Sequence, residues 1–118
     1  MFRLIIAGGR EFEDYVLLSQ SVDEYISELD DQEIEIVCGC ASGADALGAR
    51  YGMSKGYKIN YYKPEWETYG RAAGPIRNEK MAQNADGLIA FWNGSSAGTK
   101  NMISLARQHG LKVKVVMY

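Results

Sequence analysis

The sequence has few of the residues that build metal sites and disulfide frameworks. It contains two cysteines, Cys38 and Cys40, spaced as C-x-C, and a single histidine, His109, far away along the chain. A structural zinc site normally uses four Cys or His ligands, so these three side chains are too few to form one. We therefore expect no metal site and no cofactor, and we interpret the two cysteines as free, largely buried thiols.

Long apolar runs, a targeting signal and an excess of positive charge are also missing. Apolar runs such as 4–7 are far shorter than the roughly 20 residues of a membrane-spanning helix. Residues 1–4 lead straight into a strand pattern and have no signal-peptide layout, so we expect a cytoplasmic protein without a membrane partner. The net charge is −2 and no run of Lys or Arg occurs. Because phosphate neutralisation supplies most nucleic-acid affinity, nucleic acid is not an expected partner.

The size and composition of the chain are those of one soluble domain. It has 118 residues, of which 47% are hydrophobic and 24% are charged. These proportions are ordinary for a globular protein, and the length suffices to bury one hydrophobic core. We therefore expect residues 1–118 to form a single domain.

Short apolar runs alternate with segments of helical periodicity. The runs predicted as strands are 4–7, 34–38, 59–62, 88–92 and 113–117. The helical segments between them place one apolar face inward through Leu18, Val22, Ile26 and Leu29; Ala44, Leu47 and Tyr51, with a stop at Gly56; Met81 and Ala85, after Pro75; and Met102, Ile103 and Ala106, before Gly110. Parallel strands joined by helices cross over right-handedly. The pattern predicts an α/β protein with a three-layer α/β/α Rossmann-like fold and a five-stranded parallel sheet in the order 3-2-1-4-5.

Three glycine-rich junctions follow the first, second and fourth predicted strands. They span 8–12, 39–45 and 93–99, and they contain six of the 13 glycines, namely Gly8, Gly9, Gly39, Gly43, Gly94 and Gly98. Ligands of open parallel sheets bind at the carboxyl ends of the strands, beside the point where the strand order reverses. Each junction also opens a helix, whose free N–H groups attract anions. We therefore expect an anion site here, although tight turns alone would also explain the glycines.

Known phosphate-binding motifs do not fit these junctions. Residues 8–13 lack the spacing of the dinucleotide pattern G-x-G-x-x-G, and 94–100 places its lysine after the threonine, unlike a P-loop. The hydroxyl groups of Ser95, Ser96 and Thr99 are nevertheless suited to donating hydrogen bonds to phosphate oxygens.

Arginines are a second sign of an anion site. Pro75 fits the first turn of its helix, which would place Arg77 in the same turn, where a cation opposes the helix dipole. A bound anion would remove this conflict, since a guanidinium pairs with phosphate through two hydrogen bonds. For Arg77, Arg71 and Arg10 alike, the alternative is a surface salt bridge.

Aromatic and acidic side chains near the junctions have two interpretations each. Trp66 and Tyr69 either stack on a base or cap the core. Asp45 is either a capping acid at the start of its helix or an acceptor for a ribose hydroxyl. Asp14 has the position of an ordinary helix N-cap.

Four segments together resemble a known family. Residues 8–12, 42–45, 70–78 and 98–99 look like the YspA-like branch of the SLOG superfamily, which includes the lonely-guy phosphoribohydrolases, the DNA-processing proteins and several nucleotide-ligand sensors. The resemblance covers nearly the whole chain and implies a single Rossmann-like SLOG-type domain. It implies that Arg77 contacts a ribose phosphate and that Gly98-Thr99 ends a phosphate loop. It also leaves a homodimer open, because related proteins often pair through helices.

One departure from the phosphoribohydrolases concerns catalysis. Those enzymes carry a catalytic glutamate soon after the Gly-Thr pair, whereas this chain continues with Lys100, Asn101 and Met102. N-glycoside cleavage needs a carboxyl group as general acid or charge stabiliser, and only Asp45 or Glu79 could substitute. The sequence therefore favours a domain that senses or sequesters a nucleotide-derived small molecule. A phosphoribohydrolase-like N-glycosidase acting on nucleoside monophosphates is the alternative.

The residues expected to contact the ligand come from the glycine-rich junctions and from the arginine-containing segment. They are Gly8, Gly9, Arg10, Gly43, Ala44, Asp45, Arg71, Arg77, Asn78, Gly94, Ser95, Ser96, Gly98 and Thr99.

Overall fold

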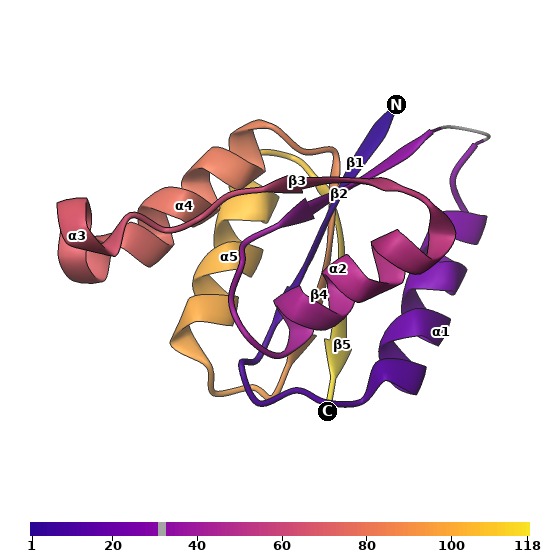
Figure 1. The fold of residues 1–118 in the computed structure, drawn as a ribbon, viewed down its shortest axis with the longest axis horizontal. Helices are drawn as coiled ribbons and strands as arrows, with labels where there is room; N and C mark the ends of the chain where they lie inside the picture. The colour runs from indigo at the N-terminus through magenta and orange to yellow at the C-terminus, as the bar shows by residue number, and fades with distance from the viewer. Residues whose placement is uncertain (31–32) are drawn as a thin grey trace.

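The structure is a computed structural model that describes residues 1–30 and 33–118. Its centre is a parallel sheet of five strands in the order β3-β2-β1-β4-β5, which confirms the predicted fold (Figure 1). The strands are β1 (Phe2–Gly8), β2 (Ile34–Cys38), β3 (Lys58–Tyr61), β4 (Gly87–Trp92) and β5 (Lys112–Met117). In the register, Leu4 of β1 lies opposite Ile36 of β2 and Gly87 of β4.

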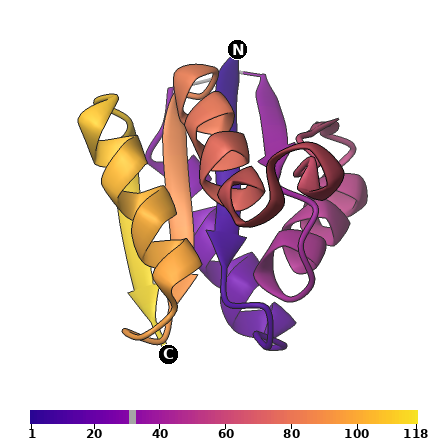
Figure 2. The ribbon, with the colours of Figure 1, turned by 90° about the vertical axis from the view of Figure 1, so that its left-hand side faces the viewer.

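Helices cover both faces of the sheet. They are α1 (Tyr15–Ser27), α2 (Ala44–Lys55), α3 (Trp66–Tyr69), the 3₁₀ turn η1 (Gly70–Ala72), α4 (Ala73–Gln83) and α5 (Ala97–Gln108). Figures 1 and 2 show α1 and α2 on one face and α4 and α5 on the other, while α3 lies beyond the edge of the sheet. The architecture therefore has the expected three layers.

The strand sequences explain why the core has two halves. Successive side chains of β1 point to opposite faces, so Leu4 and Ile6 pack with α1 and α2, whereas Ile5 and Ala7 pack with α4 and α5. The three inner strands are buried almost throughout, as near-continuous apolar runs predict for a sheet covered on both sides. The edge strands β3 and β5 are more exposed.

The start of α1 and the end of α2 follow the sequence signals, whereas two predicted helical residues lie outside their helices. Asp14 caps α1 as predicted, because its Oδ1 accepts the N–H of Leu17 at 3.0 Å. Gly56 ends α2 in the left-handed conformation, with φ of 73°. Leu29 and Ala85, however, lie beyond the ends of α1 and α4, and they reach the core from the following loops.

The predicted position of Arg77 in its helix is wrong by one turn. Pro75 does lie in the first turn of α4, but the helix begins at Ala73 because η1 leads directly into it. Arg77 therefore lies in the second turn, and its conflict with the helix dipole is weaker than the sequence suggested.

Two further features of the described residues bear on the expectations above. No helix in the ranges 1–30 and 33–118 is both long enough and apolar enough to span a bilayer. Both cysteines are free thiols, but only Cys38 is buried, whereas Cys40 is partly exposed.

Candidate functional site

A pocket of about 350 Å³ lies at the carboxyl edge of the sheet. This volume is within the range of sites that bind small molecules, roughly 300 to 1,000 Å³. Its walls come from the end of β1, the β2–α2 junction, the α3–η1 segment, α4 and the start of α5. The lining residues are Ala7, Gly8, Arg10, Ala41, Asp45, Trp66, Arg71, Gly74, Pro75, Arg77, Asn78, Met81, Ser96, Ala97, Gly98, Thr99, Asn101 and Met102.

The structure brings most of the sequence-predicted residues to this pocket. Those that line it are Gly8, Arg10, Asp45, Arg71, Arg77, Asn78, Ser96, Gly98 and Thr99; those that do not are Gly9, Gly43, Ala44, Gly94 and Ser95. For the description below, the inner wall comprises the lining residues at the strand ends and at the starts of α2 and α5, together with Arg77 and Asn78 of α4. The outer wall comprises Trp66 and Arg71.

Gly43 supports the inner wall from behind. Its φ is 72°, and a Cβ at this position would overlap the carbonyl oxygen of Gly9 and lie 2.5 Å from the carbonyl carbon of Arg10. The two junctions are also joined by hydrogen bonds, since the N–H of Ala44 donates to the Gly9 carbonyl at 3.1 Å. A glycine is therefore needed for the β1–α1 and β2–α2 junctions to pack against each other.

The β4–α5 junction presents backbone donors rather than the hydroxyl groups that the sequence suggested. Asn93 Oδ1 accepts the N–H groups of Ser95 and Ser96 at 2.8 and 2.9 Å, so those amides are occupied. The hydroxyl of Ser96 caps α5 and accepts from Thr99 Oγ1 at 3.1 Å. The first amides of a helix have no partner within it, and Ala97 and Gly98, the first two residues of α5, line the pocket. This wall is suited to an anion.

Asp45 is a buried carboxylate in the inner wall, with 6% of its surface exposed. Its Oδ2 accepts the N–H of Ala41 at 3.1 Å, so the side chain satisfies a backbone N–H of the turn before α2, whereas the start of α2 itself has no side-chain cap. Burial raises the pKa of Asp45, whereas the Ala41 N–H, Arg77 and Arg10 act in the opposite direction. Removal from water therefore outweighs the nearby positive charges.

Arg77 is held in place by groups on three elements. Its Nη1 donates to the Gly39 carbonyl, and its Nε donates to Asn78 Oδ1 at 2.9 Å. Asn78 is buried and is fixed in turn by Asn101, whose Oδ1 accepts from Asn78 Nδ2 at 2.9 Å. Burial lowers the pKa of Arg77, and the charge of Asp45 counteracts this effect. The guanidinium is thus oriented before any ligand arrives.

The Asp45 carboxylate and the Arg77 guanidinium both lie close to the backbone of Gly39. A Cβ there would lie 2.8 Å from Asp45 Oδ2 and 2.9 Å from Arg77 Nη1. A side chain at position 39 would therefore displace one or both of these charged groups.

The pocket is positive although the chain is acidic. Three arginines and one aspartate line it, whereas the net charge of the chain is −2. In the described part of the chain, Arg10, Arg71 and Arg77 have no carboxylate oxygen within 4.0 Å, so the salt-bridge interpretation is not supported for any of them. Their charge is available to a ligand.

Trp66 and Tyr69 do not cap the core. Trp66 is 49% exposed and lines the pocket, while Tyr69 is 43% exposed and lies outside it. The core-capping interpretation is therefore wrong for both.

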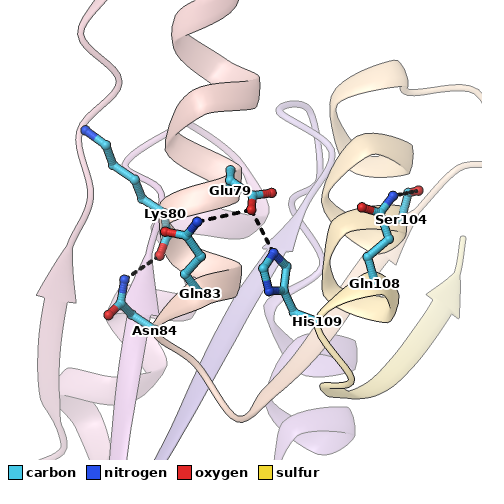
Figure 3. Close-up of polar contacts among 7 residues, drawn as sticks. All are labelled: Glu79, Lys80, Gln83, Asn84, Ser104, Gln108 and His109. Carbon is cyan, nitrogen blue, oxygen red and sulfur yellow. Dashed lines mark hydrogen bonds and ion pairs between the residues drawn. The ribbon is translucent and has the colours of Figure 1, made fainter.

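The second candidate acid, Glu79, lies outside the pocket. Figure 3 shows its carboxylate directed toward His109, whose Nε2 lies 2.7 Å from Glu79 Oε1. The same oxygen accepts from Gln83 Nε2 at 3.2 Å. Of the two carboxylates suggested by the sequence, only Asp45 faces the cavity.

Sequence reasoning missed several lining residues. Ala41 and Ala97 have only a methyl side chain, which leaves little signal in the sequence, and Met81 and Met102 were interpreted as core residues. Both methionines are indeed buried, but they also line the pocket. The helical spacing of Gly74, Asn78 and Met81 could have identified this face of α4.

Comparison with known proteins supports the same fold. Residues 2–69 match the family model YAcAr, described as the YspA, cpYpsA-related SLOG family. The fold is similar to that of DNA processing protein A (DprA) from Streptococcus pneumoniae, with a TM-score of 0.72 and 19% sequence identity over 97% of this chain and 49% of that one. The chain thus spans about half the length of that protein, and at this identity the likeness concerns the fold alone. No curated protein matches the chain.

Proposed function

The chain belongs to the YspA, cpYpsA-related SLOG family, and we propose that its pocket binds the phosphate group of a nucleotide or nucleotide-derived small molecule, in a sensing or sequestering role. The observation that carries this proposal is the positive pocket beside free helix amides. Ala97 and Gly98 offer N–H groups, and Arg77 offers a guanidinium whose position is already fixed. Donors that need no rearrangement lose little entropy when an anion binds.

Isothermal titration with nucleoside monophosphates tests the proposal. Arg10→Gln is the most informative variant, because Arg10 is exposed, lines the pocket and has no ion-pair partner in the described residues, so folding does not depend on it. A charged hydrogen bond contributes enough that its loss raises Kd about tenfold or more. Affinity is also expected to fall as salt is added.

Arg107→Gln is the matched control. Arg107 is an exposed arginine near the end of α5 and does not line the pocket, so its loss removes the same charge from the chain without touching the site. No binding by the unaltered protein at millimolar nucleotide, or equal losses in Arg10→Gln and Arg107→Gln, would contradict the proposal.

A second candidate function is hydrolysis of the N-glycosidic bond of a nucleoside monophosphate. The observation that favours it is Asp45, a carboxyl group that lines the pocket and whose pKa is raised by burial. Such a group retains its proton at higher pH and can donate it to the departing base, while water adds to the anomeric carbon and gives ribose 5-phosphate. The phosphoribohydrolases carry a catalytic glutamate soon after the Gly-Thr pair, whereas in this chain the pair is soon followed by Met102, which lines the pocket. Binding is the leading proposal because this glutamate is missing.

Chromatography of nucleoside monophosphates after incubation separates the two functions. Release of free base that is lost in Asp45→Asn and kept in Glu79→Gln would support hydrolysis. Base release that survives in Asp45→Asn would exclude Asp45 as the acid, and binding without base release would leave the first proposal standing alone.

A further inference from the structure

Trp66 is a large aromatic side chain that the fold leaves half uncovered beside the pocket. It begins α3, a helix of four residues, none of which is buried. Figure 1 shows this helix beyond the edge of the sheet, away from both halves of the core. Burying an indole ring stabilises a protein by a few kcal/mol, and the half-exposed indole of Trp66 offers such apolar surface to a ligand in the cavity.

Trp66 borders the pocket together with Gly74 and Arg71. Gly74 at the start of α4 lies under the edge of the indole, since a Cβ at Gly74 would be 3.7 Å from Trp66 Cη2. Arg71 lines the same pocket and has no carboxylate within 4.0 Å in the described residues. Indole and guanidinium groups both stack on planar rings.

The pocket therefore has two ends of different chemistry. The inner wall offers amide N–H groups and the oriented guanidinium of Arg77, which suit an anion. The outer wall offers Trp66 and Arg71, which suit a planar π system. A sugar phosphate or inorganic phosphate would use only the first end, whereas a nucleotide would use both.

We propose, resting on the function proposed above, that Trp66 stacks on the heteroaromatic base of the ligand and makes the pocket selective for nucleotides over sugar phosphates. Stacking of a base on an aromatic side chain depends little on which base is present, because every base has a π face. Trp66 thus distinguishes nucleotides from other phosphates rather than one base from another. From the usual strength of such stacking, we expect a preference of about tenfold to a hundredfold.

The test compares adenosine 5′-monophosphate with ribose 5-phosphate, which shares the phosphate and the sugar but lacks the base. Isothermal titration is carried out on the unaltered protein, Trp66→Ala and Trp66→Phe. Trp66→Ala is expected to abolish the preference by weakening nucleotide binding alone, with the Kd for ribose 5-phosphate unchanged. Trp66→Phe is expected to restore most of the preference, because phenylalanine keeps a stacking face.

Tyr69→Ala is the matched control, because Tyr69 is a similarly exposed aromatic residue on the same short helix but does not line the pocket. It is expected to leave both affinities unchanged. Equal weakening by Trp66→Ala and Tyr69→Ala would overturn the proposal, since it would indicate a general effect on α3. A change in elution volume of Trp66→Ala with an intact nucleotide preference would also overturn it and would assign Trp66 to contacts between copies of the chain.

The outcomes also separate this inference from the function on which it rests. If ribose 5-phosphate binds as tightly as the nucleotide, the phosphate site stands and the stacking role of Trp66 is wrong. If neither compound binds to the unaltered protein, the proposed function itself fails.

Discussion

The inner and outer walls of the pocket face the same cavity but are held in place in different ways. On the inner wall, Asp45 is almost fully buried and bound to the Ala41 N–H, and Arg77 reaches it from α4 with two hydrogen bonds of its own. On the outer wall, no residue of α3 or η1 is buried. The difference teaches that the charged end of the site is set by the fold, whereas the aromatic end is attached to it by few contacts.

Two glycines with similar backbone angles, one beside each wall, allow this difference to be measured. Gly43 supports the inner wall and has φ 72° and ψ −126°, while Gly70 follows α3 and has φ 57° and ψ −130°. A Cβ at Gly43 would overlap the backbone of Gly9, but a Cβ at Gly70 would meet nothing within 4 Å. Substitution by alanine therefore imposes similar strain at both positions and a steric overlap at only one.

The largest expected effect is that of Gly43→Ala. Strain and overlap together should lower the free energy of unfolding by about 3 to 5 kcal/mol, compared with about 1 to 2 kcal/mol for the strain alone in Gly70→Ala. Urea unfolding followed by circular dichroism measures both values. Equal losses in the two variants would show that the inner wall is no more tightly packed than the outer wall.

Asp45→Asn should change how stability depends on pH. The pKa of Asp45 is raised above its ordinary value of 3.8, so the folded protein holds this proton to higher pH than the unfolded chain does. Ionisation of this carboxyl group therefore lowers the free energy of unfolding as pH rises from the ordinary pKa to the raised pKa. Above the raised pKa the loss is complete. Urea unfolding between about pH 4 and 7 should show the unaltered protein losing stability relative to Asp45→Asn. A difference that stays constant, or changes in the other direction, would contradict the raised pKa.

Glu79→Gln should have the smallest effect. The Glu79 and His109 side chains are 38% and 32% exposed, and an ion pair of this kind contributes at most about 1 kcal/mol. Nucleotide affinity is expected to be unchanged, because Glu79 lies outside both walls (Figure 3). Titration calorimetry checks this prediction. A tenfold loss of nucleotide affinity would contradict it and would indicate that the site includes the far side of α4.

The sequence was sufficient for the fold because its signals are periodic and long. Buried strands appear as apolar runs, and the alternation of strand and helix restricts the topology to few arrangements. The turn of Arg77 in α4 was predicted wrongly because no side chain caps the start of this helix: Ala72 precedes it and offers no hydrogen-bonding group. The start of α1, by contrast, was correct because Asp14 caps it.

The sequence was less informative about the site, since much of it is backbone. It identified the correct junctions, but which amides are free depends on Asn93, whose side chain occupies those of Ser95 and Ser96. Nor could it show that Trp66 stays exposed, because this follows from the position of α3 beyond the sheet. Spacing alone does not exclude Glu79 either: it follows Arg77 by two residues, about 200° around a helix, but Pro75 and Arg77 have the same separation and both line the pocket.

The position of the central strand β1 has a consequence for how the protein folds. β1 lies between β2 and β4, and the Arg3 N–H donates to Asp86 Oδ2 across 83 positions of sequence. Closing so large a loop costs entropy before it gains contacts, so we expect β4 to dock late in folding. The two junctions that flank the cavity, after β1 and after β4, meet only then. A small molecule present during refolding would thus act on the finished protein, slowing its unfolding without accelerating its assembly.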